Sequence, residues 1–294
     1  MKTQLRQLLK HCMNSFSILL LLVQLWACEN EAQTLSGTTP TPQYKPTDSS
    51  SVNDSLLAVA EAEKKAFVKL PKTPIDSNSQ VIYLTFDDGP LSPTPFLTQI
   101  INEKQIKICE FAVGKHAKAN KQFMGHLDAM KRNPLIEVHN HSYSHANHKY
   151  KAYYSAPAGA AKDIMDNEDI IGTNTKIVRM PGRDIWATSQ IQRGWSQSGG
   201  KTAAILLENG FRVYGWDIEW EHYSNTLPKR SPEQIVAQID DMFRHNAMQT
   251  PNHLVFLGHD EMLAKEKGRE DLRRIIDMLK ERNYVFEFIS HYPR

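Results

Sequence analysis

Short apolar stretches alternate with longer amphipathic ones over the last two thirds of the chain. The short stretches are rich in β-branched and aromatic residues, which is the pattern of buried strands. The expected strands are 81–86, 106–113, 135–138, 177–180, 211–216, 254–257 and 284–289. Between them, apolar residues recur every three or four positions, as they do in helices that cover a sheet. The expected helices are 95–104, 121–132, 158–171, 201–209, 232–245 and 271–282.

This alternation indicates an α/β fold with a parallel sheet, because parallel strands need helical crossovers. About seven strand–helix units fall within roughly 210 of the 294 residues. That density favours a closed or nearly closed barrel over a doubly wound sheet. We therefore expect a single domain over residues 79–292, with its functional residues at the carboxyl ends of the strands.

The N-terminus has a different pattern. Three basic residues precede an apolar run over residues 16–26, which is too short to span a bilayer comfortably and is typical of a secretory signal. The run ends in Leu25-Trp26-Ala27-Cys28, which resembles the lipobox of bacterial lipoproteins. The resemblance implies a signal peptide over residues 1–27 and a lipid anchor on Cys28. An exported, membrane-anchored protein of the periplasm or outer membrane is expected.

Composition narrows the class of partner. Residues 28–78 contain a stretch rich in Thr, Pro and Ser that resembles a flexible tether, with one possible short helix at 56–70. Loss of the signal would remove three of the 35 basic residues and none of the 33 acidic ones, so the mature chain is nearly neutral. A nucleic-acid partner needs a basic surface and is not expected. No protein partner is inferred. The three cysteines provide no disulfide framework.

The strand at 81–86 ends at two adjacent carboxylates, Asp87 and Asp88, followed by Gly89 and Pro90. Two neighbouring Asp side chains repel each other unless a metal ion or an Arg lies beside them. His141 and His145 follow another predicted strand and are four residues apart, so in one helical turn both would point the same way. One Asp and two His form a three-ligand set of the kind that catalytic zinc uses.

These residues carry a family resemblance. The segments Thr85-Phe86-Asp87-Asp88-Gly89-Pro90 and His141-Ser142-Tyr143-Ser144-His145 resemble the first two motifs of the polysaccharide deacetylases, carbohydrate esterase family 4. The resemblance implies a distorted (β/α)7 barrel and metal-dependent hydrolysis of acetyl groups on sugars. It implies that Asp88, His141 and His145 hold a divalent metal, most simply Zn²⁺. Asp87 would be the general base.

Later segments match the family motifs less closely. Arg179 precedes Pro181 in Arg179-Met180-Pro181-Gly182-Arg183, and the resemblance implies that it orients Asp87 and keeps it charged. The second Pro of the family motif is missing, and Arg183 lies nearby. His259, in Leu257-Gly258-His259-Asp260, would be the general acid. Either Asp217 or Glu219, which alternate onto one face of a strand, would orient it.

Two further residues have plainer interpretations. His139 lies two residues before His141, and we expect it to line the site or to support a ligand from behind rather than to be a fourth metal ligand. Cys109 falls within a predicted strand and is expected to be a buried thiol rather than a nucleophile.

The leading functional hypothesis is N-deacetylation of a polysaccharide that contains N-acetylhexosamine, in the bacterial envelope. An O-acetyl esterase would use the same residues on a different leaving group. A carbohydrate-binding barrel without catalysis is a weaker alternative, because binding gives no reason for Asp87 beside a complete ligand set. A non-haem iron oxygenase also uses two His and one carboxylate, but the Asp-Asp-Gly-Pro segment has no role in oxygen activation.

Overall fold

The computed structural model describes residues 69–293. The predicted signal peptide, the lipobox with Cys28 and residues 28–68 of the predicted tether lie outside these residues. The last two positions of the possible helix at 56–70 are described, and they are not helical. Among the described helices, none is both long and apolar enough to cross a membrane.

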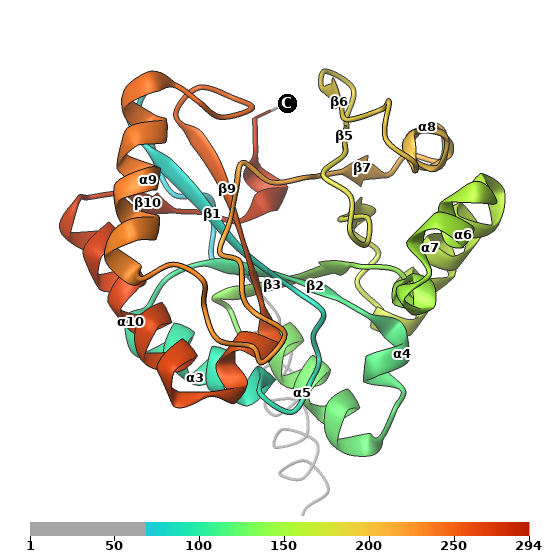
Figure 1. Cartoon of the computed structure of the whole chain (residues 1–294), viewed down its shortest axis with the longest axis horizontal. Helices are drawn as coiled ribbons and strands as arrows, with labels where there is room; N and C mark the ends of the chain where they lie inside the picture. The colour runs from blue at the N-terminus through green and yellow to red at the C-terminus, as the bar shows by residue number, and fades with distance from the viewer. Residues whose placement is uncertain (1–68, 294) are drawn as a thin grey trace, which may run out of the picture. The chain divides into compact units, whose positions relative to one another are not determined.

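The described strands form one curled sheet in the order β6-β5-β7-β4-β3-β2-β1-β9-β8, and β10 pairs with β1 (Figure 1). All of its pairs are parallel except those of β5 with β6 and with β7. The strands are β1 (Val81–Asp87), β2 (Ile108–Ala112), β3 (Ile136–Asn140), β4 (Ile177–Val178), β5 (Trp186–Ala187), β6 (Gln192–Arg193), β7 (Arg212–Val213), β8 (Ile218–Glu219), β9 (His253–His259) and β10 (Val285–Phe286).

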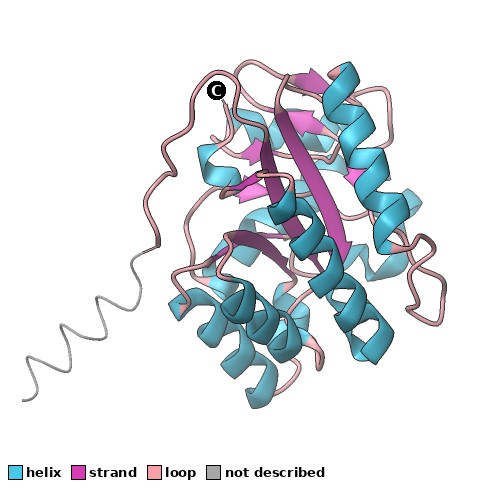
Figure 2. Ribbon diagram, turned by 90° about the vertical axis from the view of Figure 1, so that its left-hand side faces the viewer, coloured by secondary structure: helices cyan, strands magenta, loops and turns pink. Residues whose placement is uncertain are grey.

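Helices cover the outer side of the sheet, as Figures 1 and 2 show. This is the expected distorted (β/α)7 barrel, with the strands curled into an incomplete barrel. The helices are α3 (Thr94–Lys104), α4 (Gly114–Ala117), α5 (Lys121–Arg132), α6 (Tyr150–Ser155), α7 (Pro157–Ile171), α8 (Gly200–Glu208), α9 (Pro232–His245) and α10 (Glu266–Glu281). Three 3₁₀ turns complete the described elements: η1 (His145–His148), η2 (Asp260–Ala264) and η3 (Ile289–His291).

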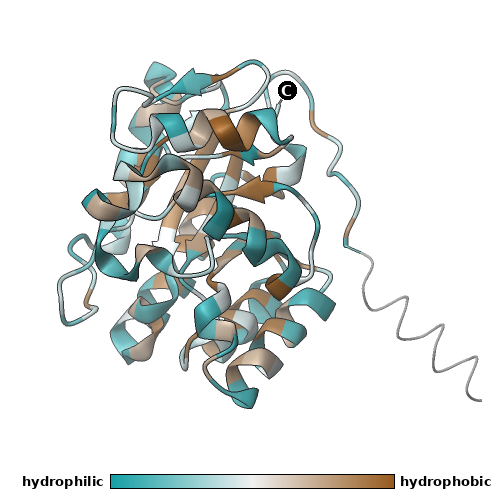
Figure 3. Ribbon diagram, turned by 90° about the vertical axis from the view of Figure 1, so that its right-hand side faces the viewer, coloured by the Kyte–Doolittle hydropathy of each residue, from teal (hydrophilic) through white to brown (hydrophobic). Residues whose placement is uncertain are grey.

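Strand β1 is buried along its whole length, and its side chains alternate between two apolar cores. Ile82, Leu84 and Phe86 belong to the core that the strands share with the helices. Val81 and Tyr83 belong to a second core on the inner side of the sheet. Figure 3 shows the hydrophobic segments gathered along the strands and on the helix sides turned toward them. Because strand side chains alternate, Asp87 continues the inner row at the end of β1.

The sequence predicted helices with strong local signals most accurately. The bounds of α5 and α9 agree with prediction at both ends. In α9, Ser231 and Gln234 form a capping box ahead of the helix, and Pro232 occupies its first turn. Helix α10 begins five residues earlier than predicted, at Glu266. The antiparallel pair β5–β6 and the short helices α4 and α6 were not predicted.

Candidate active site at the carboxyl ends of the strands

The two carboxylates predicted to organise the chain lie where β1 ends. Asp87 is the last residue of β1 and is 2% exposed. The backbone of Asp88 has φ of 81°, a left-handed conformation that a non-glycine residue seldom adopts. This turn points the two neighbouring carboxylates into one cavity at the carboxyl edge of the sheet. Asp87 and Asp88 are therefore placed where a parallel sheet usually carries its site.

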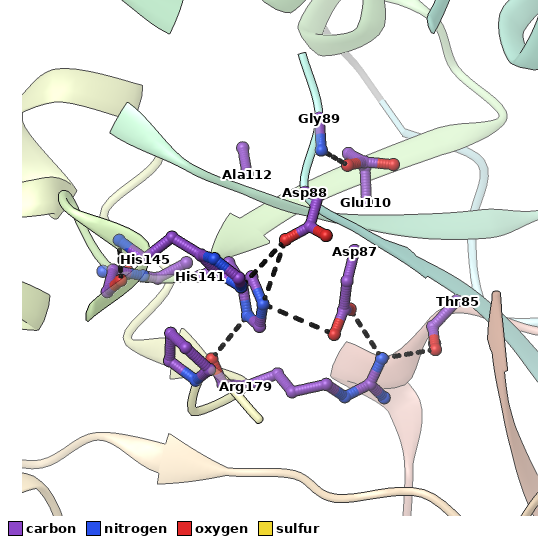
Figure 4. Close-up of polar contacts among 12 residues, drawn as sticks. Thr85, Asp87, Asp88, Gly89, Glu110, Ala112, His141, His145 and Arg179 are labelled. Atoms are coloured by element: carbon purple, nitrogen blue, oxygen red, sulfur yellow. Dashed lines mark hydrogen bonds and ion pairs between the residues drawn. The ribbon is translucent and has the colours of Figure 1, made fainter. Parts of the chain in front are cut away.

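Glu110 stabilises this turn through a hydrogen bond to its backbone. Its Oε1 accepts a hydrogen bond of 2.8 Å from the Gly89 backbone N–H (Figure 4). A Cβ added to Gly89 would lie only 2.4 Å from the same oxygen, so the close approach requires glycine. Burial and the nearby charge of Asp260 raise the pKa of Glu110 well above its usual value. Glu110 is thus a buried carboxyl group that fixes the backbone next to Asp88.

Asp88, His141 and His145 bring three possible ligand atoms together. The Asp88 Oδ1 lies 3.6 Å from the Nε2 of His141 and 3.1 Å from the Nε2 of His145. All three donor atoms lie within 4.8 Å of one another. Figure 4 shows the Asp88 carboxylate facing the two imidazoles. The structure therefore assembles the metal-ligand set that the sequence suggested.

Two observations test whether this set fits a metal ion. The Asp88 Oδ1 is buried and has no hydrogen-bond partner in the described structure. The other ring nitrogen of His141, Nδ1, lies 2.8 Å from the carbonyl oxygen of Arg179, which fixes Nε2 toward the site. An unsatisfied buried oxygen and a backbone-oriented imidazole are what a metal site requires. The residues present fit a divalent cation.

The path between the two histidines differs from the prediction. Ser142 and the four residues from His145 to His148 have positive φ angles between 46° and 68°. The segment therefore contains a left-handed turn rather than the right-handed helical turn assumed from the four-residue spacing. The side-chain oxygen of Ser142 accepts a 3.0 Å hydrogen bond from the His145 backbone N–H and holds this turn. The imidazoles meet through loop geometry.

Arg179 is completely buried beside Asp87. Its Nη1 donates hydrogen bonds of 2.9 Å to Asp87 Oδ1 and 2.7 Å to Thr85 Oγ1, and its Nη2 donates to the carbonyl oxygen of Gly215 at 3.0 Å. The guanidinium carbon also lies 4.3 Å from the centre of the Phe111 ring. The second Asp87 oxygen lies 3.6 Å from His141 Nε2, so it remains directed at the ligand set.

A cavity of about 380 Å³ opens over these groups. Beyond the ligand set and Asp87, its walls include His259, Glu219, Trp216, Tyr150, His222 and Glu261. Burial lowers the pKa of His259 to about 4, although the charge of Asp87 opposes that change. The Nδ1 of His259 is buried without a hydrogen-bond partner in the described structure. His259 thus lies in the cavity as predicted, and no carboxylate binds its Nδ1.

Burial in this cavity also shifts the pKa values of the proposed ligands toward their uncharged forms. Burial, together with the neighbouring Asp87, raises the pKa of Asp88 well above its usual value. Burial and the neighbouring imidazoles lower the pKa of His145 to about 2. A divalent cation at this point would favour a charged Asp88 and neutral imidazoles, which are the forms that ligate metals.

Comparison with known proteins agrees with this geometry. The family model described as polysaccharide deacetylase matches residues 75–197, which include the Asp-Asp turn, both histidines and Arg179. Over these residues, which make up less than half of the chain, the protein is similar to polysaccharide deacetylases. A peptidoglycan-N-acetylglucosamine deacetylase of Bacillus cereus is 26% identical over 73% of this chain and 72% of its own length. A chitin disaccharide deacetylase of Vibrio alginolyticus is 21% identical over 80% of this chain and 76% of its own length.

Solved deacetylase structures share the fold. The catalytic domain of a peptidoglycan N-acetylglucosamine deacetylase from Eubacterium rectale superposes with a TM-score of 0.53 at 24% identity. The match covers 76% of this chain and 94% of that domain. At this identity the similarity establishes the architecture, and the roles of individual residues rest on the geometry above.

Two residues of this domain are not where the sequence analysis expected them. Asp217 could not orient His259, because its two oxygens accept hydrogen bonds from the backbone N–H groups of Gln249 at 2.7 Å and Val255 at 2.8 Å. Asp217 precedes β8 and does not line the cavity, whereas Glu219 does. His139 does not line the cavity either, since its ring nitrogens contact Glu137 and Thr175.

Sequence analysis missed several residues that shape the candidate site. Glu110 could have been identified from the sequence, because a carboxylate in the middle of an apolar strand is unusual without a specific partner. No sequence pattern pointed to His222 and Glu261, because they are far apart in the chain and meet only in the fold, at 3.1 Å. Asp260 lies next to the predicted general acid, yet its side chain bonds to Thr94 away from the cavity.

Proposed function

We propose that this protein is a metal-dependent N-deacetylase that removes acetyl groups from an N-acetylhexosamine polysaccharide. The observation that carries the proposal is the placement of Asp87, held by Arg179, beside the three converging ligand atoms of Asp88, His141 and His145. The named substrates of the relatives, peptidoglycan and chitin disaccharide, support an amino-sugar substrate.

The ligand set would hold one divalent ion, and zinc suits two imidazoles and a carboxylate. When bound, such an ion polarises the acetyl carbonyl and makes water more acidic. The remaining chemistry belongs to the side chains. Asp87 accepts the proton of the attacking water through the oxygen that faces the ligand set. Arg179 holds the other oxygen, so that Asp87 keeps one orientation throughout.

His259 is the proton donor to the leaving nitrogen in this proposal. His259 lines the same cavity as the ligand set. The other histidines of that cavity are the two proposed ligands, His141 and His145, and the outer residues His148 and His222. Burial disfavours the protonated form of His259 in the free protein. Negative charge that develops on the acetyl oxygen as water adds would favour that form again. Glu219, which lines the cavity, supplies further negative charge; Asp217 has no part in the reaction.

Acetate release tests the proposal. The purified protein is incubated with chitin oligomers, peptidoglycan, poly-N-acetylglucosamine and acetylated xylan, with and without zinc. We expect zinc-dependent release from an amino-sugar substrate, together with a free amine on the product. Asp87→Asn keeps the size of the side chain and is expected to lower kcat by about 10²–10⁴-fold with metal binding retained. Metal binding without release from any of the substrates would contradict the proposal and favour the carbohydrate-binding alternative.

An O-acetyl esterase is the second candidate, and the environment of His259 favours it. An ester releases an alkoxide that needs less help from a proton donor than an amine does. The unpartnered Nδ1 and lowered pKa make His259 a weak donor in the free protein. His259→Ala discriminates between the two reactions. A large loss of acetate release is expected for N-deacetylation, whereas an esterase would retain most of its activity on acetylated xylan.

We further propose that the protein is exported and anchored by lipid on Cys28, in the outer membrane or facing the periplasm. The lipobox-like segment Leu25-Trp26-Ala27-Cys28 supports this location, and Glu29 follows the cysteine. Labelling of cells with a palmitate analogue is expected to modify the wild-type chain and not the Cys28→Ser variant. Equal labelling of both would exclude the anchor.

A further inference from the structure

A second group of ligand-type side chains lies deeper in the barrel. Cys109 is the second residue of β2, and Glu137 and His139 are the second and fourth residues of β3. In the sheet register Cys109 pairs with Glu137, and Phe111 pairs with His139. Side chains of paired and alternate residues share one face of a sheet. Cys109 and Phe111 belong to the inner core, so the whole group faces the interior of the barrel.

The donor atoms of this group converge. Glu137 Oε2 lies 2.9 Å from His139 Nε2 and 4.0 Å from Cys109 Sγ. The three atoms all lie within 4.8 Å of one another. A tetrahedral zinc ion with bonds of about 2.0–2.3 Å separates its ligand atoms by roughly 3.3–3.8 Å. Shifts of a few tenths of an ångström up to about one ångström would therefore place all three around one ion.

Each donor residue is also held from behind by a further contact. The backbone N–H of Ile289 donates to Cys109 Sγ at 3.1 Å, a contact that stabilises a thiolate. The His139 Nδ1 lies 3.0 Å from Thr175 Oγ1, and Ser290 Oγ donates to Glu137 Oε1 at 2.7 Å. Metal-ligating imidazoles and carboxylates commonly have such outer partners, which aim the remaining atom at the ion. Here the remaining atoms are Sγ, Nε2 and Oε2.

Burial and access are compatible with a bound ion. Cys109 is fully buried and His139 is 1% exposed, so the donors are shielded from bulk water. Glu137 and His139 also line a cavity of about 450 Å³, which provides a route for the ion and space for a water molecule as fourth ligand. Lys69, which lines the same cavity, donates to the carbonyl oxygens of Lys131 and Asn133. A thiolate and a carboxylate together balance the charge of a divalent ion.

We propose that Cys109, Glu137 and His139 bind a zinc ion at a second site, distinct from the deacetylase ligand set. On binding, the Cys109 thiol releases its proton to solvent and its sulfur bonds to the ion. The site joins β2 to β3, and through the contacts of Ile289 and Ser290 it joins both strands to η3. It does not depend on the proposed deacetylation.

Cobalt provides a direct test, because a thiolate bound to Co²⁺ gives an intense near-ultraviolet charge-transfer band that nitrogen and oxygen ligands do not give. The full chain carries Cys12→Ser and Cys28→Ser, which leaves Cys109 as its one thiol. Because the Asp88, His141 and His145 set can also bind the ion, we expect the band to reach full intensity by two equivalents of cobalt. His141→Ala, which damages the deacetylase ligand set, is expected to keep it, and Cys109→Ser is expected to lose it.

Two results would overturn the second site. One is a folded His141→Ala variant that shows no band at saturating cobalt; the other is a band that persists in Cys109→Ser. If Cys109→Ser fails to fold, the Glu137→Gln and Thr175→Val variants are measured in its place. Each leaves the thiol in place and is expected to weaken cobalt binding, as measured by the band, by about 10–100-fold. Unchanged affinity in both variants would also reject the site.

Discussion

Two sets of three donor atoms lie on the inner side of one sheet, and their surroundings differ. The set of Asp88, His141 and His145 follows the ends of β1 and β3, in turns where Asp88 and His145 have φ angles of 81° and 49°. The set of Cys109, Glu137 and His139 lies within regular strands. Non-glycine residues in left-handed conformations are costly and tend to occur at functional sites. The first set also has an unsatisfied carboxylate oxygen, whereas in the second set Glu137 and His139 bond to each other.

Hydrolysis requires acid and base groups in addition to converging metal ligands. Only the first set has a second carboxylate, Asp87, held by a buried Arg179, and an imidazole, His259, across the same cavity. The second set borders a cavity that Lys69, Lys131 and Arg212 also line; Lys69 donates to the carbonyl oxygens of Lys131 and Asn133, and Arg212 donates to the Tyr214 hydroxyl. The first arrangement suits hydrolysis, and the second suits binding.

The largest expected effect separates the two sets by activity. Asp88→Ala removes a ligand at the first set, and because a bound metal supplies several kcal/mol of transition-state stabilisation, activity is expected to fall by about 10³-fold or more. His139→Ala removes a donor at the second set and is expected to lose far less activity. Acetate release at saturating zinc measures both. Equal losses in the two variants would break the distinction.

A smaller effect concerns stability at the first set. Arg179→Met leaves the buried Asp87 without its cationic partner, so the free energy of unfolding is expected to fall by about 3–5 kcal/mol. Arg183→Met is the matched control, because the Arg183 side chain is only partly buried and bonds to Ser198, so its loss leaves no buried carboxylate without a partner. Its expected cost is about 1 kcal/mol. Urea unfolding followed by circular dichroism compares them, and similar losses would contradict the role given to Arg179.

The smallest effect is a pH dependence at the cavity rim. The hydrogen bond to Glu261 raises the pKa of His222 above its usual 6.5. A raised pKa means that the folded state binds the proton more tightly, so this contribution is present below about pH 6.5 and is lost as the pH rises through the folded-state pKa. Because the Glu261 side chain is 44% exposed, the contribution is at most about 1 kcal/mol.

His222→Ala tests this dependence. At pH 5.5 the variant is expected to melt about 1–2 °C below the wild type, and at pH 9 the two are expected to melt together. A difference in Tm that is the same at both pH values would show that His222 acts by packing alone.

The sequence was most informative where the determinants are local. Residues 81–90 contain both the apolar strand and the carboxylates at its end, and Ser231 with Gln234 marks the start of α9. These features depend on neighbours in the chain, so a single sequence displays them. The Asp-His-His ligand set and Arg179 were identified through family motifs, and the fold brings them together as those motifs imply.

The sequence was least informative where contacts are long-range. Strand β5 consists of two residues, Trp186 and Ala187, whose pairing with β7 depends on the whole sheet. The histidine spacing suggested a helical turn, although Ser142 directs the chain into a left-handed one. Asp217 and Glu219 are two residues apart, so the sequence could not distinguish them. In the structure the backbone N–H groups of Gln249 and Val255 donate to Asp217. The pairing of Cys109 with Glu137 likewise requires the sheet register.

Zinc titration of metal-free protein tests the central claim most directly. Bound zinc and acetate released from an N-acetylglucosamine oligomer are measured in the same samples, for the wild type and for Asp87→Asn. We predict that wild-type activity rises with zinc occupancy, and that Asp87→Asn binds as much zinc while its activity stays about 10²–10⁴-fold lower. Acetate release that does not depend on zinc, or an Asp87→Asn variant as active as the wild type, would contradict the assignment of the catalytic site.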